Sequence, residues 1–177
     1  MAEQLPAPIR ELREQVDEID EKLIDLIAQR QDTVMKIAAN KTEKNIPIYD
    51  PEREKQIFDK VEKRFGKQRA NGFKLVYGIM MDIHRYREYE VFPKDFYVPT
   101  GCGGVTIRAL IEDTPFSLCR YLSPLSVADV TVLSIQSRSC PGGKLIVDLE
   151  LSGDIETPSL AAALSVLCDT SESFAFL

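Results

Sequence analysis

Apolar residues follow a helical period over residues 9–43. The stripe recurs at steps of three and four and consists of Ile9, Leu12, Val16, Ile19, Leu23, Ile27, Val34, Ile37 and Ala38. This pattern predicts one helix over residues 8–43, which at 1.5 Å per residue would be about 50 Å long. A small domain cannot bury the whole apolar face of such a helix, so we expect a partner helix from a second copy of the chain.

Two cations interrupt this apolar stripe and a third lies beside it. Arg30 stands three residues after Ile27. Lys41 stands four residues after Ile37, and Arg13 flanks the start of the stripe. A buried cation without a partner is very costly, so this face needs an anion, such as a small polyanionic ligand held between helices. The alternative is that these side chains lie along the apolar surface with their charged groups in water.

Two more helices are predicted in the first half of the chain. Pro47 ends the long helix, because proline and the residue before it leave helical space. Asp50 followed by Pro51 gives an N-cap and a proline at the first helical position of the second helix. That helix runs to the residue before Gly66, which is a suitable C-cap, and a third helix covers residues 70–91.

The second half alternates strand and helix signals. Proline, glycine and aromatic residues replace the helical period over residues 93–104, which predicts a linker. The pattern beyond it predicts strands at 105–112, 129–137, 144–151 and 173–177, and helices at 114–123 and 157–167. The βαββαβ order is typical of a two-layer α/β sandwich with an antiparallel sheet. We therefore expect a multidomain chain, with an all-α three-helix domain at residues 1–92 and an α/β domain at residues 105–177.

Charge and composition narrow the class of protein. A length of 177 residues allows one large domain or two small ones, and the net charge of −6 argues against a nucleic-acid partner. Residues 101–177 hold four of the 22 basic residues and nine of the 28 acidic ones, so the second half is acidic. No apolar run resembles a signal peptide or is long enough to span a membrane, so we expect a cytoplasmic protein.

The cysteines do not predict a metal site. The chain has four, Cys102, Cys119, Cys140 and Cys168, and they form no CxxC pair. With one histidine, His84, a zinc site is not expected, and the cysteines are interpreted as reduced thiols.

Further polar residues share the apolar faces of the predicted helices. Arg53 and Glu54 open the second helix, and His84 and Glu88 lie four residues apart on one face of the third. Taken singly, each has an ordinary explanation as a surface residue, and Asp50 as a helix cap. Their joint occurrence with the cations of the first helix indicates a binding site.

Three blocks of this half resemble the all-α, type II chorismate mutases. Residues 12–30 (LREQVDEIDEKLIDLIAQR), Lys41 and residues 48–54 (IYDPERE) keep the spacing of that family, whereas residues 80–88 (MMDIHRYRE) are similar to its closing motif more loosely. The resemblance covers about residues 8–90. It implies an intertwined homodimer that converts chorismate to prephenate by an intramolecular Claisen rearrangement, an isomerase of phenylalanine and tyrosine biosynthesis in the shikimate pathway. It implies no cofactor and no metal.

The resemblance also implies roles for individual residues. Arg30 and the partner subunit's Arg13 would bind the two carboxylates of chorismate, with Arg53 supporting the same end of the site. Lys41 would donate to the ether oxygen, and Glu54 would accept a hydrogen bond from the ring hydroxyl. The implied catalytic residues are Arg13, Arg30, Lys41, Arg53, Glu54 and Glu88, and the implied substrate-binding residues are Asp50 and His84.

Two positions depart from the family pattern. Position 84, usually serine, is histidine here, and His84 would either donate to the ring carboxylate or crowd it. Position 88, often glutamine, is glutamate, and an ionised Glu88 would repel the charge that develops on the ether oxygen. Glu88 must therefore be protonated to help, and we expect activity to fall as the pH rises and this proton is lost. The alternative is that Glu88 pairs with Arg85 or Lys41 and the enzyme is weaker.

The second half resembles an ACT domain, a ligand-sensing module of amino-acid biosynthesis. Residues 133–138 (LSIQSR) are similar to the Ile-Glu-Ser-Arg element of the phenylalanine-sensing version attached to prephenate dehydratases. Residues 113–118 stand where that version has a Pro-Gly-Ala-Leu turn, with Phe116 in place of the glycine. The candidate effector-binding residues are Asp113, Thr114, Phe116, Ser117, Leu118, Ser137 and Arg138. The resemblance implies allosteric control by phenylalanine or tyrosine at a dimer interface, and the alternative is a ligand-free dimerisation module.

Two other functions stay open from the sequence. Isochorismate-pyruvate lyase shares the helical fold and takes a related dianion, although the appended domain argues against it. A non-catalytic sensor or scaffold is the second alternative, because His84 and Glu88 depart from the family pattern. The sequence does not fix the effector, the sign of regulation, or whether the oligomer grows beyond a dimer.

Overall fold

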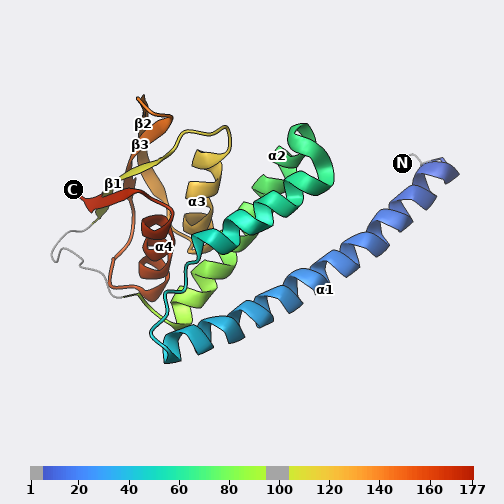
Figure 1. The fold of residues 1–177 in the computed structure, drawn as a ribbon, viewed down its shortest axis with the longest axis horizontal. Coiled ribbons are helices and arrows are strands. Elements are labelled where there is room, and N and C mark those ends of the chain that lie inside the picture. The colour runs from blue at the N-terminus through green and yellow to red at the C-terminus, as the bar shows by residue number, and fades with distance from the viewer. Residues whose placement is uncertain (1–5, 95–103) are drawn as a thin grey trace, which may run out of the picture. The chain divides into compact units, whose positions relative to one another are not determined.

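The structure is a computed structural model that describes residues 6–94 and 104–177. It divides into two compact units, residues 1–37 and 38–177. The predicted linker, residues 93–104, lies mostly outside the described residues. The helices and strands in chain order (Figure 1) are α1 (Ala7–Glu43), α2 (Pro51–Val91), β1 (Val105–Glu112), α3 (Ser117–Val127), β2 (Val132–Cys140), β3 (Lys144–Leu151), α4 (Pro158–Asp169) and β4 (Ser173–Phe176).

Helix α1 confirms the first predicted helix to within a residue. Its apolar stripe is exposed in the single chain, with relative exposures between 43% and 60% at Ile9, Leu12, Val16, Ile19, Leu23 and Ile27. Large exposed apolar patches are costly in water and typically mark an interaction site. The partner helix expected on this face stays a prediction.

Helix α2 begins as predicted and bends where the glycine was expected to end it. The Asp50 side chain accepts a hydrogen bond from the Arg53 backbone N–H at 2.9 Å, and Pro51 occupies the first helical position. Gly66 has φ 74° and ψ 155°, a non-helical conformation that favours glycine, and it divides α2 into two arms. The second arm starts directly after Gly66 rather than at residue 70. Near the bend, the rings of Phe65 and Phe73 stack with centroids 3.9 Å apart.

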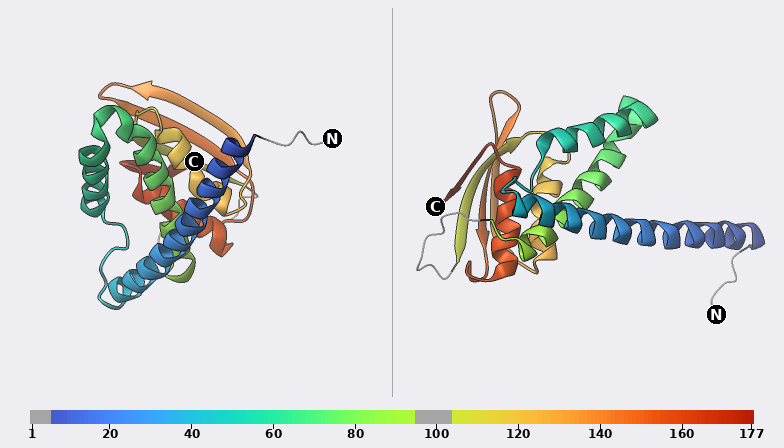
Figure 2. Two further views of the ribbon diagram at one scale, coloured as in Figure 1. Left: turned by 90° about the vertical axis from the view of Figure 1, so that its right-hand side faces the viewer. Right: turned by 60° about the horizontal axis from the view of Figure 1, so that its bottom comes forward.

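The second half forms a four-stranded antiparallel sheet in the order β2-β3-β1-β4. The predicted βαββαβ order is confirmed. Strand β1 alternates buried and more exposed positions, which is the period of a strand with one face in the core. Helices α3 and α4 cover that face, and the second arm of α2 covers α3 and α4 in turn (Figure 2).

The second arm of α2 is part of the same core as the sheet. Tyr86 and Tyr89 are buried in one apolar cluster with β1, β3 and α4. The Tyr89 hydroxyl donates to the Asp169 carboxylate at the end of α4, and Lys94 Nζ donates to the same carboxylate at 2.6 Å. Polar and apolar contacts thus hold the helical layer of the sheet against α2.

Helix α3 differs most from the prediction, because it covers Ser117–Val127 instead of residues 114–123. The helix continues past the predicted end at residue 123, although Pro124 has no N–H to donate to the Arg120 carbonyl. The Ser123 hydroxyl donates to that carbonyl at 2.8 Å and replaces the missing bond, so the helix continues. At the other end, the Thr114 backbone N–H donates to the Ser117 hydroxyl in a local turn before the helix.

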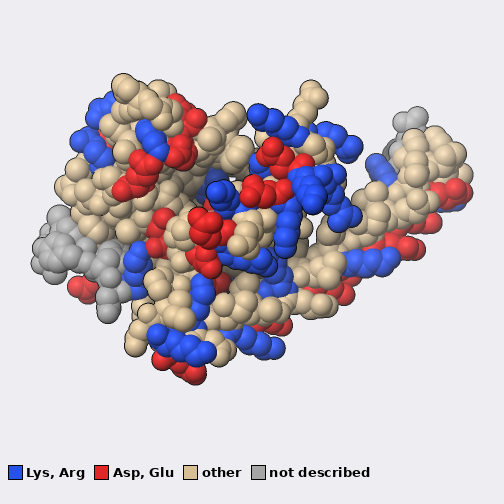
Figure 3. All heavy atoms as spheres, in the orientation of Figure 1, with Lys and Arg blue, Asp and Glu red and all other residues tan. Residues whose placement is uncertain are grey.

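Charged side chains of both signs are interspersed on the face drawn in Figure 3. Among the described residues, no helix combines the length and the apolar character needed to cross a membrane. Residues 6–94 and 104–177 also contain no group of three His, Cys, Asp or Glu side chains placed to hold a metal ion. Cys119, Cys140 and Cys168 are free thiols, and Cys102 lies outside the described residues.

Candidate active site

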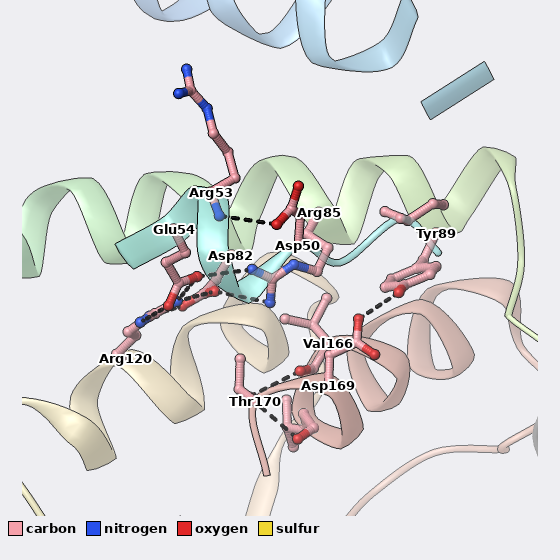
Figure 4. Close-up of polar contacts among 12 residues, drawn as sticks. Asp50, Arg53, Glu54, Asp82, Arg85, Tyr89, Arg120, Val166, Asp169 and Thr170 are labelled. Carbon is pink, nitrogen blue, oxygen red and sulfur yellow. Dashed lines mark hydrogen bonds and ion pairs between the residues drawn. The ribbon is translucent and has the colours of Figure 1, made fainter. Parts of the chain in front are cut away.

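Four charged side chains meet where α2 packs against α3 (Figure 4). Glu54 lies in the first turn of α2 and Asp82 and Arg85 in its second arm, whereas Arg120 lies on α3. Arg120 donates from Nη1 and Nη2 to Glu54 Oε1 and Oε2, at 2.8 and 2.7 Å. It also donates from Nε and Nη2 to Asp82 Oδ2 and Oδ1, at 2.5 and 2.9 Å. Arg85 Nη2 donates to Glu54 Oε2 at 3.1 Å. We call these four residues the ion cluster.

The ion cluster is largely removed from water. The exposed fraction of the side chain is 1% for Asp82, 9% for Arg85, 12% for Glu54 and 15% for Arg120. Two positive and two negative groups balance, which is the condition under which buried charges are tolerated. Arg85 Nη1 lies 3.4 Å from Asp82 Oδ1 but makes no hydrogen bond in the part of the chain that is described.

Burial and ion pairing act in opposite directions on the two carboxylates. Burial alone would raise the pKa of Glu54, but the hydrogen bonds and positive charges of Arg120 and Arg85 outweigh it and hold the pKa below its ordinary value. For Asp82, which is buried more deeply, burial outweighs the same two arginines and the pKa is raised. Burial alone would lower the pKa of Arg120, yet its two carboxylate partners raise it, so its charge is permanent.

Two aromatic rings contact the arginines of the cluster. The guanidinium carbon of Arg85 lies 4.1 Å from the ring centroid of Tyr49, and that of Arg120 lies 5.5 Å from the ring centroid of Phe58. Cations are attracted to the faces of aromatic rings, and these rings also exclude water. Burial, followed by repulsion from Glu54, raises the pKa of Tyr49, so its hydroxyl stays protonated near neutral pH.

Near the start of α2 the structure brings some of the predicted residues together. Lys41 Nζ donates to the Ile48 carbonyl at 2.9 Å, which anchors the end of α1 to the segment before α2. Asp50 is engaged as the N-cap. The Arg53 side chain is exposed, donates to Gln56 Oε1 at 3.2 Å, and points away from Glu54 in Figure 4.

The other predicted residues lie on α1 and on the second arm of α2. His84 is 3% exposed and Glu88 is partly buried, so His84 does not lie on a solvated face. Arg13 is exposed and Arg30 is partly buried on α1, in the first unit. The roles assigned to these four residues stay predictions.

The candidate effector residues lie on two segments, and a hydrogen bond links the first segment to the residue directly after the second. The Ser139 hydroxyl, at the end of β2, donates to Asp113 Oδ2 at 2.8 Å, in the loop after β1. That loop contains Thr114 and leads to Phe116, the residue that precedes α3. Ser137 and Arg138 are exposed on β2, where they pair with Val147 and Ile146 of β3. Leu118 is partly buried against the core.

Sequence analysis missed three members of the ion cluster as site residues, Asp82, Arg85 and Arg120, and named Arg85 only as an alternative partner of Glu88. A signal for Arg120 was present, since it is the one charged residue in the α3 segment Ser117–Val127. Asp82 gave a weaker signal, because it stands in a helix with many charged residues. The pairing of Asp82 with Arg120 joins residues 38 positions apart and could not be inferred from a local pattern.

Comparison with known proteins finds similar proteins for the helical half. Residues 12–89 match the family model described as chorismate mutase type II. The chorismate mutase of Methanocaldococcus jannaschii is 46% identical over 55 residues, which cover 31% of this chain and 56% of that protein. The bifunctional chorismate mutase/prephenate dehydratase of Aquifex aeolicus is 36% identical over 80 residues, which cover 45% of this chain and 21% of that protein. The resemblance predicted from the sequence blocks is thus confirmed for this half.

The matches leave much of each relative uncovered. The chain spans about half the length of the first relative and about a fifth of the second. A solved prephenate dehydratase from Arthrobacter aurescens, in complex with L-Phe, shares 25% identity over 48% of this chain and 29% of its own length. The TM-score of this match is 0.41.

Proposed function

We propose that this chain, whose residues 12–89 match the type II chorismate mutase family, is an isomerase that converts chorismate to prephenate. The observation that carries the proposal is that the matched segment contains every predicted catalytic residue. These are Arg13, Arg30, Lys41, Arg53, Glu54 and Glu88.

The reaction asks two things of the protein. Chorismate must be held in the conformer in which its side chain approaches the ring, because such positioning supplies much of the rate enhancement of an intramolecular reaction. Negative charge that develops on the ether oxygen must also be stabilised as the C–O bond breaks. Arg30 and the partner subunit's Arg13 serve the first need, since a guanidinium binds a carboxylate through two parallel hydrogen bonds.

Lys41 serves the second need. Its ammonium group has three N–H donors, and the Ile48 carbonyl accepts from it. This bond fixes the ammonium near the start of α2 and leaves donor capacity for the ether oxygen. Glu54 accepts from the ring hydroxyl, which recognises the substrate without taking part in bond breaking.

We further propose that the chain works as a homodimer paired along α1. The exposed apolar stripe of α1 supports this, because pairing with a second copy would bury it and would bring the partner subunit's Arg13 to each site. The dimer is therefore part of the catalytic proposal.

A continuous assay of chorismate consumption and prephenate formation tests the function. Arg30→Ala should lower kcat/KM by about 10- to 100-fold, since a hydrogen bond to a charged group contributes about 1.5–3 kcal/mol. The matched control is Lys22→Ala on the same helix, which removes an exposed cation without an assigned role. A wild-type chain that turns over no chorismate would refute the proposal. Pyruvate release from isochorismate would instead support the lyase alternative.

We also propose that the βαββαβ half binds an aromatic amino acid that regulates the mutase. The hydrogen bond between Ser139 and Asp113 supports this, because it links the first of the two segments that resemble an ACT domain to the residue directly after the second. Calorimetry of the full chain with phenylalanine, tyrosine and tryptophan tests it. Heat from phenylalanine or tyrosine is expected, and no heat from any of the three would favour a dimerisation module without a ligand.

A further inference from the structure

The ion cluster contains a residue from outside the matched helical segment. Arg120 lies on α3 of the βαββαβ half, whereas Glu54, Asp82 and Arg85 all lie within residues 12–89. Arg120 nevertheless makes four hydrogen bonds to the cluster, two of them to the Glu54 carboxylate. We propose that Arg120 is a positioning residue that holds Glu54 in place for the ring hydroxyl of the substrate. This inference rests on the function proposed above.

The hydrogen bonds of the cluster fix the Glu54 carboxylate but leave it able to accept a further hydrogen bond. The carboxylate accepts three hydrogen bonds in the described part of the chain, one at Oε1 and two at Oε2. An ionised carboxylate has about four acceptor sites, so Oε1 retains capacity for one more donor. A bidentate arginine also fixes the plane of the carboxylate, which a single lysine bond cannot do.

Charge balance makes Arg120 necessary for this arrangement. Without it, the Glu54 and Asp82 carboxylates would share Arg85 as their remaining cation within the cluster. Two buried carboxylates facing one cation repel each other, so Glu54 would move toward solvent or take up a proton. The neighbouring Tyr49 could not compensate, because its hydroxyl is uncharged near neutral pH.

Removal of Arg120 should change KM rather than kcat. The ring hydroxyl is unchanged by the rearrangement, so Glu54 binds the substrate and the transition state alike. Loss of such uniform binding raises KM and leaves kcat nearly unchanged. Because Arg120 keeps Glu54 ionised, its removal should also move the acidic limb of the pH dependence of kcat/KM to higher pH.

Kinetic analysis of full-length variants tests the inference. Arg120→Met, which removes the charge but keeps much of the volume, should raise KM about tenfold or more, and Arg120→Lys should recover part of this loss. The matched control is Arg108→Met, because Arg108 pairs with Asp148 between neighbouring strands of the same half. Arg108→Met should leave KM unchanged.

A double-mutant cycle separates positioning from a general effect on folding. If Arg120 acts through Glu54, Arg120→Met should change kcat/KM by less than about threefold when Glu54→Gln is already present. Equal KM values and pH profiles for the wild type and Arg120→Met, or fully additive losses with Glu54→Gln, would overturn the inference. These outcomes differ from failure of the proposed function, in which the wild-type chain itself would not consume chorismate.

Discussion

Replacing Gly78 by alanine tests whether Arg120 is as firmly held as the structure indicates. Gly78 is buried in the second arm of α2, and the Arg120 side chain crosses it. A Cβ at this position would lie 3.0 Å from Arg120 Cδ and 3.1 Å from Nε. These atoms cannot retreat easily, because the guanidinium beyond them is fixed by four hydrogen bonds to Asp82 and Glu54.

Two opposing effects set the magnitude. Alanine in a helix interior is favoured over glycine by about 1 kcal/mol. Forcing an extra methyl group into a packed region costs about 1–3 kcal/mol, and the cost belongs at the upper end because the displaced group carries charge-assisted hydrogen bonds. We therefore expect Gly78→Ala to lower the free energy of unfolding by about 1–2 kcal/mol, which for a chain of this size lowers Tm by about 2–8 °C.

Gly72 provides the matched control on the same arm of α2. A Cβ there would meet nothing within 4 Å, so Gly72→Ala should raise the free energy of unfolding by about 1 kcal/mol. Both variants should be melted at one fixed protein concentration, since the stability of an oligomer depends on it. In an Arg120→Ala background, Gly78→Ala should become stabilising. If Gly78→Ala stabilises the wild type as much as Gly72→Ala does, the described packing of Arg120 is wrong.

Three further predictions address the core and the titratable groups. Leu164→Ala should lower the free energy of unfolding in urea by about 2–5 kcal/mol, because Leu164 is fully buried in the core, and a loss below 1 kcal/mol would contradict that burial. Glu54→Gln should lower the free energy of unfolding more at neutral pH than at about pH 3. The lowered pKa of Glu54 stabilises the fold at pH values above its ordinary pKa near 4.5, and this contribution is lost as the pH falls through the lowered pKa. Asp82, whose pKa is raised, has the opposite pH dependence and offsets part of the change in wild-type stability with pH, so the variant must be compared with the wild type at each pH. Equal losses of unfolding free energy at both pH values would exclude the ion pairing of Glu54. Glu88→Gln should flatten the pH dependence of turnover between about pH 5 and 9, since an amide donates its N–H at any pH, and an unchanged profile would exclude Glu88 as the acidic donor.

Local patterns were enough to predict most elements of the fold. The bounds of β1 and β3 follow directly from alternating residues, and the start of α2 follows from Asp50 and Pro51. The bend at Gly66 was also predictable, because few other residues adopt positive φ readily. Helix α3 was misplaced because a serine side chain, not the backbone, compensates for Pro124.

From the sequence, candidate site residues could be proposed only where they stand in local patterns. The predicted site residues of α1 and the start of α2 stand in blocks with fixed spacing, so a single sequence is enough to propose them. The hydrogen bonds of Glu54 join it to residues 31 and 66 positions away, and they depend on how α3 packs against α2. Such pairings are decided by tertiary packing, which cannot be inferred from the hydrophobic periodicity of the sequence.

The buried tyrosines of α2 have a consequence for how this chain can be divided or recombined. Tyr86 and Tyr89 are packed into the apolar core beneath the sheet, so a fragment ending after residue 91 would expose both rings to water. The fragment would also lose Arg120 and retain two carboxylates with one guanidinium. Replacing the βαββαβ half by an unrelated domain would succeed only if that domain supplied an apolar surface to pack against Tyr86 and Tyr89 and a cation to replace Arg120. We therefore expect the two halves to be inherited together.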